Sequence, residues 1–184
     1  MEKNEKIKEA ARRMAGRDKD QAAAGTEERK KGVLVVIEDK PPVADNTTLM
    51  LYMVKLRAVD ERQPTVYFSL GESDVQVVDR LIAIVTGIDL EKIVEGRLSS
   101  DEWQLVDRKI SVLVDAQIYI DDTPEMTLDS LRTKLEGLAG KGVRLAVVDH
   151  ARKVTAAGMD TDAVLDGIRT AAGELGITVF AVMD

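Results

Sequence analysis

Five short runs of apolar and β-branched residues follow one another along the chain after residue 32. They read VLVVI (33–37), TVYFSL (65–70), QIYI (117–120), VRLAVVD (143–149) and ITVFAV (177–182). The runs are continuous rather than alternating, which is typical of strands that are buried on both faces. Segments with helical spacing of apolar residues lie between them. The pattern therefore predicts a doubly wound α/β domain with a mainly parallel, five-stranded sheet.

Helices are predicted between the strands from apolar residues spaced three or four positions apart. A capping box at Ser99 and Glu102 marks the start of one helix. Gly142 and Gly176 each stand between a helix and the next strand, where a left-handed residue ends a helix. The four apolar stripes are Val78, Leu81, Ile82 and Val85; Trp103, Val106, Ile110 and Leu113; Leu128, Leu131, Leu135 and Leu138; and Val164, Ile168, Ala171 and Leu175.

The distribution of charge divides the chain into two parts. Residues 1–31 contain ten Lys/Arg and seven Asp/Glu, whereas residues 32–184 contain 16 and 26. Residues 1–16 have only a thin apolar stripe, so they form either a solvated helix or a helix that docks on a partner. We interpret residues 1–31 as a charged helical or flexible segment with a linker, and residues 32–184 as the folded domain.

Composition excludes several classes of function. The net charge of −7 argues against a broad, non-specific nucleic-acid binder. The absence of cysteine excludes disulfides, thiolate metal sites and cysteine nucleophiles. No apolar run reaches the roughly 18 residues of a membrane span. We expect a cytoplasmic protein.

Ligands of doubly wound sheets bind outside the carboxyl ends of the strands. The stretch VIEDKPPVADNTTLML, residues 36–51, places a strand, a turn and a helix start at that edge, where a phosphate-binding loop would lie. Pro41 and Pro42 remove two N–H donors from the turn, and Ala44 replaces a glycine. Asp45 takes the position of the lysine, and Asn46 that of the hydroxyl residue.

The exchange of lysine for Asp45 has a large electrostatic cost. A charge pair about 6 Å apart at an effective dielectric of about 20 is worth roughly 3 kcal/mol. Reversing one charge therefore costs roughly 5 kcal/mol per nearby phosphate charge, over a thousandfold in affinity. Lys40 offsets part of this cost but lies on the wrong side of the turn. An ordinary turn is thus favoured over an ATP site.

Other polar residues at the strand ends allow two interpretations each. Asp149 either orients magnesium through water or caps the following turn. Asp121 and Asp122 form either a paired-carboxylate site or, since Thr-Pro and a helix follow, a turn and cap, which we favour. His150 is the only histidine and is expected to be an exposed loop residue.

Residues 66–182 resemble the C-terminal, RecA-like motor domain of the DnaB family of hexameric replicative helicases. The resemblance is carried by PTVYFSLGES, LIAIVTGIDLEKIVEGRLSSDEW, IYIDDTPEMTLDSLR, LAVVDH and GELGITVFAV. It implies a RecA-like P-loop NTPase fold in which the strand of Asp149 lies beside the first strand. It also implies ATP at the turn 39–46 and single-stranded DNA in the ring.

Matched position by position, this sequence departs from the family at most of its chemical positions. Asp149 matches the magnesium aspartate and is kept, and Gly71 matches the catalytic glutamate, with Glu72 one residue late. The other departures are Ala44, Asp45 and Asn46 for Gly-Lys-Thr, His150 for a tyrosine, Arg152 for a glutamine, and Met183 and Asp184 for the phosphate-sensing Ser-Gln. The family's DNA-contacting loops, arginine finger and N-terminal collar are also expected to be missing, unless residues 1–16 stand in for the linker helix that packs on a neighbouring motor domain.

The sequence thus predicts a degenerate helicase paralogue, a pseudoenzyme without cofactor and with weak or no DNA binding. It would act in DNA replication by binding a protein, such as a replicative helicase, its loader or itself. The alternatives are a nucleotide-binding ATPase whose rearranged Mg-ATP site uses Lys40, Thr47, Glu72 and Asp149, a DNA-binding accessory protein acting through residues 1–31, and a decaying fragment with no role.

Overall fold

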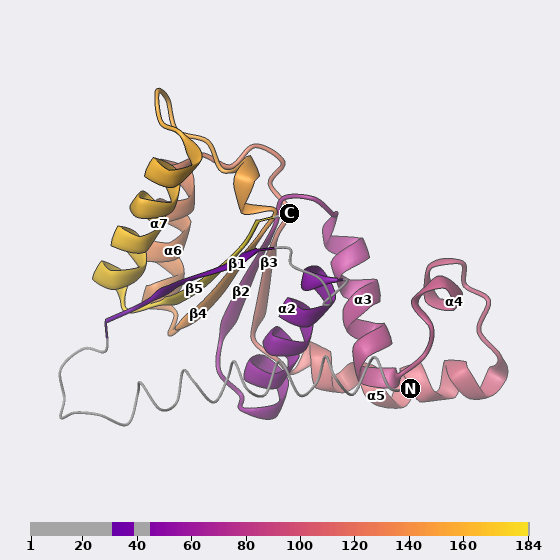
Figure 1. Cartoon of the computed structure of the whole chain (residues 1–184). Coiled ribbons are helices and arrows are strands. Elements are labelled where there is room, and N and C mark those ends of the chain that lie inside the picture. The colour runs from indigo at the N-terminus through magenta and orange to yellow at the C-terminus, as the bar shows by residue number, and fades with distance from the viewer. Residues whose placement is uncertain (1–30, 39–44, 184) are drawn as a thin grey trace.

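The computed structural model describes residues 31–38 and 45–183 of the chain. Predictions for residues 1–30, for Lys40, Pro41, Pro42 and Ala44, and for Asp184 lie outside these ranges. All five strands of the described sheet run parallel, in the order β1-β5-β4-β2-β3 (Figure 1). Their bounds are β1 Leu34–Glu38, β2 Thr65–Ser69, β3 Ile118–Asp121, β4 Leu145–Asp149 and β5 Thr178–Met183.

The fold class and the five strands are confirmed, each within two residues of the predicted bounds. The burial of the strands follows their place in the sheet. Every residue of β2 and β4 is buried, because these strands lie inside the sheet. The strands β1 and β3 form the edges, and most of their residues are only partly buried.

One implication of the resemblance is wrong. The strand that ends at Asp149 does not lie beside the first strand, because β5 pairs with both β1 and β4. The carboxyl end of β4 is instead aligned with that of β2, where Ser69 stands opposite Asp149. The aspartate is therefore one strand removed from the first strand.

Helices cover both faces of the sheet, and each pair completes a separate apolar core (Figure 1). On one face lie α2 (Asn46–Lys55), which continues into a π-helical turn at Leu56–Asp60, and α3 (Asp74–Thr86). On the other face lie α6 (Leu128–Gly140) and α7 (Thr161–Leu175), and a 3-10 turn, Ala151–Lys153, follows β4. The predicted stripes of α6 and α7 contribute to this second core, except that Ala172 takes the place of Ala171 in it.

The stripe predicted for α3 is displaced by one residue at its start. Val77, not Val78, is buried against the sheet together with Leu81, while Val78 is exposed. Both predicted glycine positions are confirmed, since Gly142 and Gly176 have positive φ angles of 90° and 64°. Within the described ranges, no helix is both long and apolar enough to cross a membrane.

Two helices project beyond the sheet. They are α4 (Leu90–Val94) and α5 (Ser100–Val114), which both pack on α3 (Figure 1). The capping box of Ser99 and Glu102 is confirmed. Hydrogen bonds, first from Lys92 of α4 and then at Ser99, lower the pKa of Glu102 to about 2.

The predicted core stripe of α5 is largely wrong, because this helix has no fully buried residue. Trp103 is 54% exposed and Ile110 is 37% exposed. Val106 and Leu113, the other two members of the stripe, are only partly buried. The projection thus carries apolar side chains on its surface.

Candidate functional site

The first turn of α2 begins at Asp45, the residue in the lysine position of a phosphate loop. Asp45 is the N-cap, and its Oδ1 accepts a hydrogen bond from the backbone N–H of Thr48 at 2.9 Å. Its Oδ2 accepts a second bond from the Thr48 hydroxyl at 2.5 Å. Capping by aspartate satisfies an N–H that has no partner within the helix. Asp45 therefore has a structural role at the helix end to which a phosphate would bind.

Arg80 of α3 supplies a positive charge beside this carboxylate. Its Nε and Nη2 donate to the Glu72 carboxylate, with shortest distances of 2.8 and 2.6 Å. Its Nη1 lies 3.4 Å from Oδ2 of Asp45 and 3.3 Å from the Thr48 hydroxyl. The hydrogen bonds with Glu72 raise the pKa of the Arg80 guanidinium, although desolvation lowers it. Asp45 is therefore not an isolated negative charge, which the sequence argument had assumed.

Asp149 is fully buried behind this ionic cluster. Its Oδ2 accepts hydrogen bonds from the Thr47 hydroxyl at 2.8 Å and the Tyr67 hydroxyl at 2.6 Å. Burial raises the pKa of the Tyr67 phenol well above its ordinary value, and the charge of Asp149 adds to this effect. Asn46, in the same first turn of α2, is also buried. The aspartate thus ties β4 to β2 and α2 through protein hydroxyls.

The histidine ring fills the space beside Gly71. A Cβ atom added at Gly71 would lie 2.5 Å from Cε1 of His150 and 2.6 Å from its Nδ1. His150 has a left-handed backbone, with φ 58°, and its side chain is only 27% exposed. His150 thus lies in a loop, as predicted, but it is only partly exposed. An imidazole lies where the side chain of residue 71 would start.

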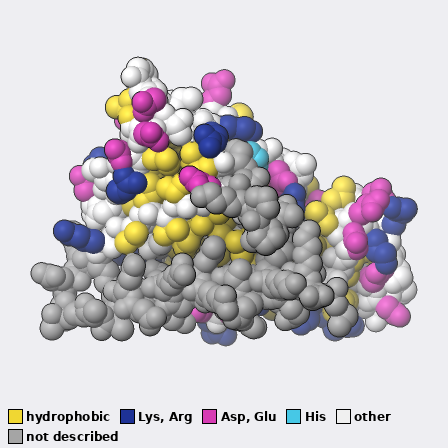
Figure 2. Space-filling model, viewed as in Figure 1, with side chains coloured by type: hydrophobic (Ala, Val, Ile, Leu, Met, Phe, Trp, Pro, Cys, Tyr) yellow, Lys and Arg dark blue, Asp and Glu magenta, His cyan; other side chains and the backbone are white. Residues whose placement is uncertain are grey.

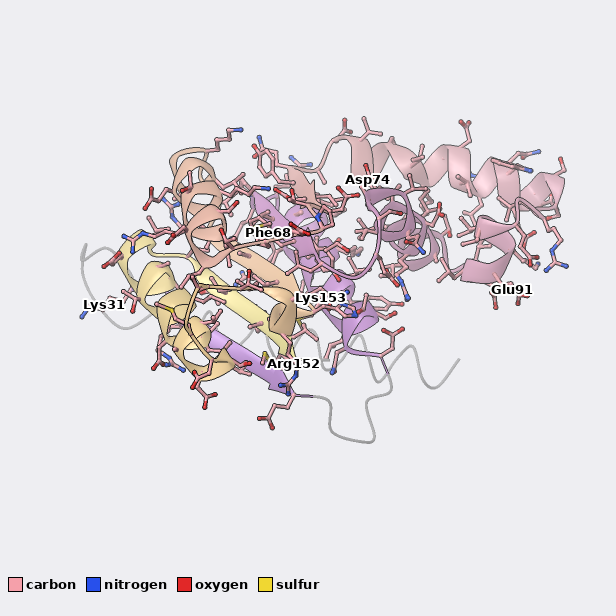
Figure 3. All side chains as sticks on the ribbon, turned by 90° about the horizontal axis from the view of Figure 1, so that it is seen from above. Lys31, Phe68, Asp74, Glu91, Arg152 and Lys153 are labelled. Atoms are coloured by element: carbon pink, nitrogen blue, oxygen red, sulfur yellow. The ribbon has the colours of Figure 1, made fainter. Side chains whose placement is uncertain are left out.

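Two cations follow the histidine at the same edge of the sheet (Figure 3). Arg152 donates from Nε to the carbonyl of Met183 at 3.3 Å, and Lys153 donates to the carbonyl of Leu70 at 2.8 Å. Both side chains thus donate hydrogen bonds to backbone carbonyl groups at the ends of strands. The Met183 position, where the resemblance expects a phosphate sensor, contributes a carbonyl oxygen to Arg152.

The two adjacent aspartates at the end of β3 have turn and capping contacts, as the favoured interpretation predicted, but the helix that Asp122 contacts is α3, whereas the N-cap of the following helix α6 is Thr127. Asp121 accepts hydrogen bonds from the backbone and hydroxyl of Thr123, and from Lys134 at 2.5 Å. Oδ2 of Asp122 accepts a bond from the backbone N–H of Asp74 at 3.0 Å, at the start of α3. The hydrogen bonds from Lys134 and Thr123 outweigh desolvation, which is the largest single influence, and lower the pKa of Asp121.

The structure brings together seven of the predicted or matched site residues and adds two that the sequence pattern did not reveal. Arg80 and Tyr67 were missed because both lie inside elements that were interpreted only as core. Arg80 lies on the partly buried side of α3, one turn after Val77, and a charged residue in that place was the available signal. The residues brought together are Asp45, Asn46, Thr47, Gly71, Glu72, Asp149 and His150. In the part of the chain that the structure describes, no cluster of three or more His, Asp or Glu is arranged to hold a metal ion.

Comparison with known proteins gives the origin of this architecture. Residues 17–183 match the family model described as the DnaB-like helicase C terminal domain. The chain belongs to this family. A replicative DNA helicase DnaB from Mycobacterium intracellulare is 31% identical to it over 144 residues, which is 74% of this chain and 25% of that protein. The DnaB-like domain thus spans about a quarter of the length of that relative.

Two solved structures agree with this chain in fold. One is described as an ATPase domain and matches with a TM-score of 0.74 at 17% identity, covering 92% of this chain and 68% of that one. The other, a DnaB-like replicative helicase whose structure was described with its interactions with primase, matches with a TM-score of 0.72 at 19% identity. That match covers 84% of this chain and 39% of the helicase. At these identities the agreement concerns the RecA-like fold of the domain.

Proposed function

We propose that this DnaB-like domain does not hydrolyse ATP and acts in DNA replication by binding another protein. The observation that carries the proposal is the bidentate ion pair of Arg80 with Glu72, next to Asp45. One guanidinium faces two carboxylates, so this cluster keeps a net negative charge. This negative charge would repel a triphosphate at the start of α2. Arg80 could bind the triphosphate only by breaking its bidentate ion pair with Glu72.

Two further features support loss of hydrolysis. Gly71 carries no carboxylate to activate water, and the ring of His150 lies in its place. Asp149 is kept, but its side chain is fully buried and accepts two hydroxyl hydrogen bonds. Both features are consistent with a fold retained after its chemistry was lost.

Calorimetric titration with Mg-ATP tests this part of the proposal. We expect a Kd weaker than about 1 mM, because the charge reversal alone costs over a thousandfold relative to a micromolar site. Asp45→Lys is the informative variant, since it restores attraction to phosphate and should strengthen binding at least tenfold. Micromolar binding by the natural chain that is lost in Glu72→Gln and Asp149→Asn would instead favour the rearranged nucleotide-binding enzyme.

The alternative enzyme also has an observation in its favour. Thr47, Glu72 and Asp149 do lie at the same edge of the sheet, as that hypothesis requires. However, the contacts of all three go to protein groups. Thr47 donates to Asp149, and Glu72 binds Arg80. A nucleotide that bound Arg80 would compete with Glu72 for this guanidinium.

The surface that we propose for protein binding is the projection of α4 and α5. Figure 2 shows hydrophobic side chains among acidic and basic ones at this end of the molecule. Trp103 is the only tryptophan, and it is 54% exposed. Exposed aromatic side chains of this kind are the commonest energetic anchors of interfaces. Residues 72–115 contain ten Asp/Glu and five Lys/Arg, a charge opposite to that of residues 1–31, which favours self-association among the candidate partners.

Substitution of Trp103 tests the proposed surface. We expect the chain to bind the replicative helicase of its host, or a second copy of itself, and Trp103→Ala to weaken that binding by about tenfold or more. Binding is measured by biolayer interferometry with immobilised partner. Met159→Ala is the matched control, because Met159 is also 54% exposed but lies before α7. Equal affinity of the two variants would show that the projection is not the binding surface.

A further inference from the structure

Arg80 connects three segments that are distant in sequence. It lies on α3, and its guanidinium binds Glu72 in the turn after β2. The same group lies within 3.4 Å of Asp45 and Thr48 in the first turn of α2. Its side chain is 23% exposed, so solvent screens these contacts only in part.

Each of the three segments is independently anchored near Arg80. The Ser69 hydroxyl donates to the Glu72 carbonyl at 2.6 Å and accepts from the Glu72 N–H at 3.3 Å, which fixes the turn after β2. Ser73 and Gln76 form a capping box at the start of α3. Asp45 caps α2. The guanidinium therefore joins segments whose backbones are already held in place, which reduces the entropy lost in forming the contacts.

We infer that Arg80 is an internal clamp that closes this edge of the domain without a nucleotide. It holds the first turn of α2, the turn after β2 and α3 together, as a ligand bound between them would do. Because α4 and α5 pack on α3, the clamp also fixes the orientation of the projection. This deepens the proposed function, since a surface held in one orientation is presented to a partner at all times.

The chemistry of the clamp requires arginine. A planar guanidinium can bind Glu72 with two nitrogen atoms while directing the third toward Asp45 and Thr48. A lysine ammonium can offer the charge, but its compact group cannot span both carboxylates with the same geometry. A neutral glutamine of similar length removes the charge.

Hydrogen exchange measured by mass spectrometry tests the clamp on the full chain, without nucleotide or partner. In Arg80→Gln we expect amides of residues 45–50 and 70–115 to exchange about tenfold faster, and in Arg80→Lys by a smaller factor. Arg132→Gln is the matched control, because Arg132 also contacts two carboxylates, those of Glu136 and Glu174, but on the opposite face of the sheet. The control should leave exchange in these two ranges unchanged.

Two results would overturn the inference. One is unchanged exchange of residues 45–50 and 70–115 in Arg80→Gln. The other is an equal acceleration in β4 and β5, which would show general loss of stability rather than local opening. The clamp and the proposed function can fail separately, because exchange is measured without ligand, whereas the titration measures ATP binding directly.

Discussion

Replacement of Asp149 by alanine is expected to lower the free energy of unfolding by about 3 kcal/mol. The carboxylate is fully buried, and its Oδ2 accepts the hydroxyl hydrogen bonds of Thr47 and Tyr67. Alanine leaves both hydroxyls without this acceptor in a site closed to water, and each such loss costs about 1–3 kcal/mol. Urea unfolding followed by circular dichroism measures the effect.

Asparagine at the same position is the matched control. Asp149→Asn keeps the shape and one oxygen acceptor, so we expect a loss of about 1 kcal/mol. The double variant Asp149→Ala with Tyr67→Phe should be more stable than Asp149→Ala with Tyr67 unchanged. Phenylalanine has no hydroxyl, so no donor is left without an acceptor at position 67. If Asp149→Ala is as stable as Asp149→Asn, the hydroxyl cluster does not hold the sheet edge.

This prediction affects how nucleotide experiments on the family's magnesium aspartate are interpreted. In this chain a loss of ligand binding in Asp149→Ala would arise from a disturbed fold as readily as from a lost metal contact. Asp149→Asn separates the two, because it changes the charge while keeping the acceptor. The same reasoning applies to Thr47, whose hydroxyl donates to Asp149.

The fold class could be predicted from local patterns because most strands and helices carry a clear periodic pattern of apolar residues. The run LAVVD is buried throughout, and the stripe of Leu131 and Leu135 packs fully into a core, so periodicity and burial agree. The stripe of α5 failed because periodicity reports an apolar face but not what covers it. The one strand neighbour that the resemblance implied, β4 beside β1, was wrong as well, because β5 lies between them.

The candidate site could be predicted only in part. The position of Asp45 followed from its place after a strand and turn, and its capping role is typical of aspartate. The pairing of Arg80 with Glu72 joins residues eight positions apart across a turn, and Tyr67 of β2 contacts Asp149 of the neighbouring strand β4. Such contacts depend on the sheet order and on the direction of each side chain, which the sequence does not specify.

The ionic cluster reduces the expected repulsion of phosphate but does not turn it into attraction. The sequence alone predicts that the charge of Asp45 repels phosphate. In the structure Arg80 offsets one of the two nearby carboxylates, Asp45 and Glu72, so one net negative charge remains. At about 6 Å and an effective dielectric of about 20, that charge still repels each phosphate charge by roughly 3 kcal/mol. The expected absence of ATP binding therefore depends on the cluster as a whole.

Placing a glutamate at position 71, where the resemblance expects the family's catalytic carboxylate, should damage the fold rather than produce hydrolysis. Any side chain there begins with a Cβ about 2.5 Å from the His150 ring, so Gly71→Glu should lower the free energy of unfolding by about 2 kcal/mol. No ATP hydrolysis should appear, because the negative cluster at the start of α2 is unchanged. Urea unfolding and a phosphate-release assay measure the two effects.

The loss of stability caused by a side chain at position 71 should arise from its clash with His150. It should vanish when His150 is replaced by alanine. Gly71→Ala alone should cost about 1–2 kcal/mol, and in the His150→Ala background nearly nothing, because the space beside residue 71 is then open. Gly137→Ala is the control for the same chemical change. Nothing lies within 4 Å of a Cβ at Gly137, and the residue is inside α6, so this change should instead stabilise the chain by about 0.5–1 kcal/mol. If Gly71→Ala costs the same with and without His150, the imidazole does not occupy the space beside residue 71.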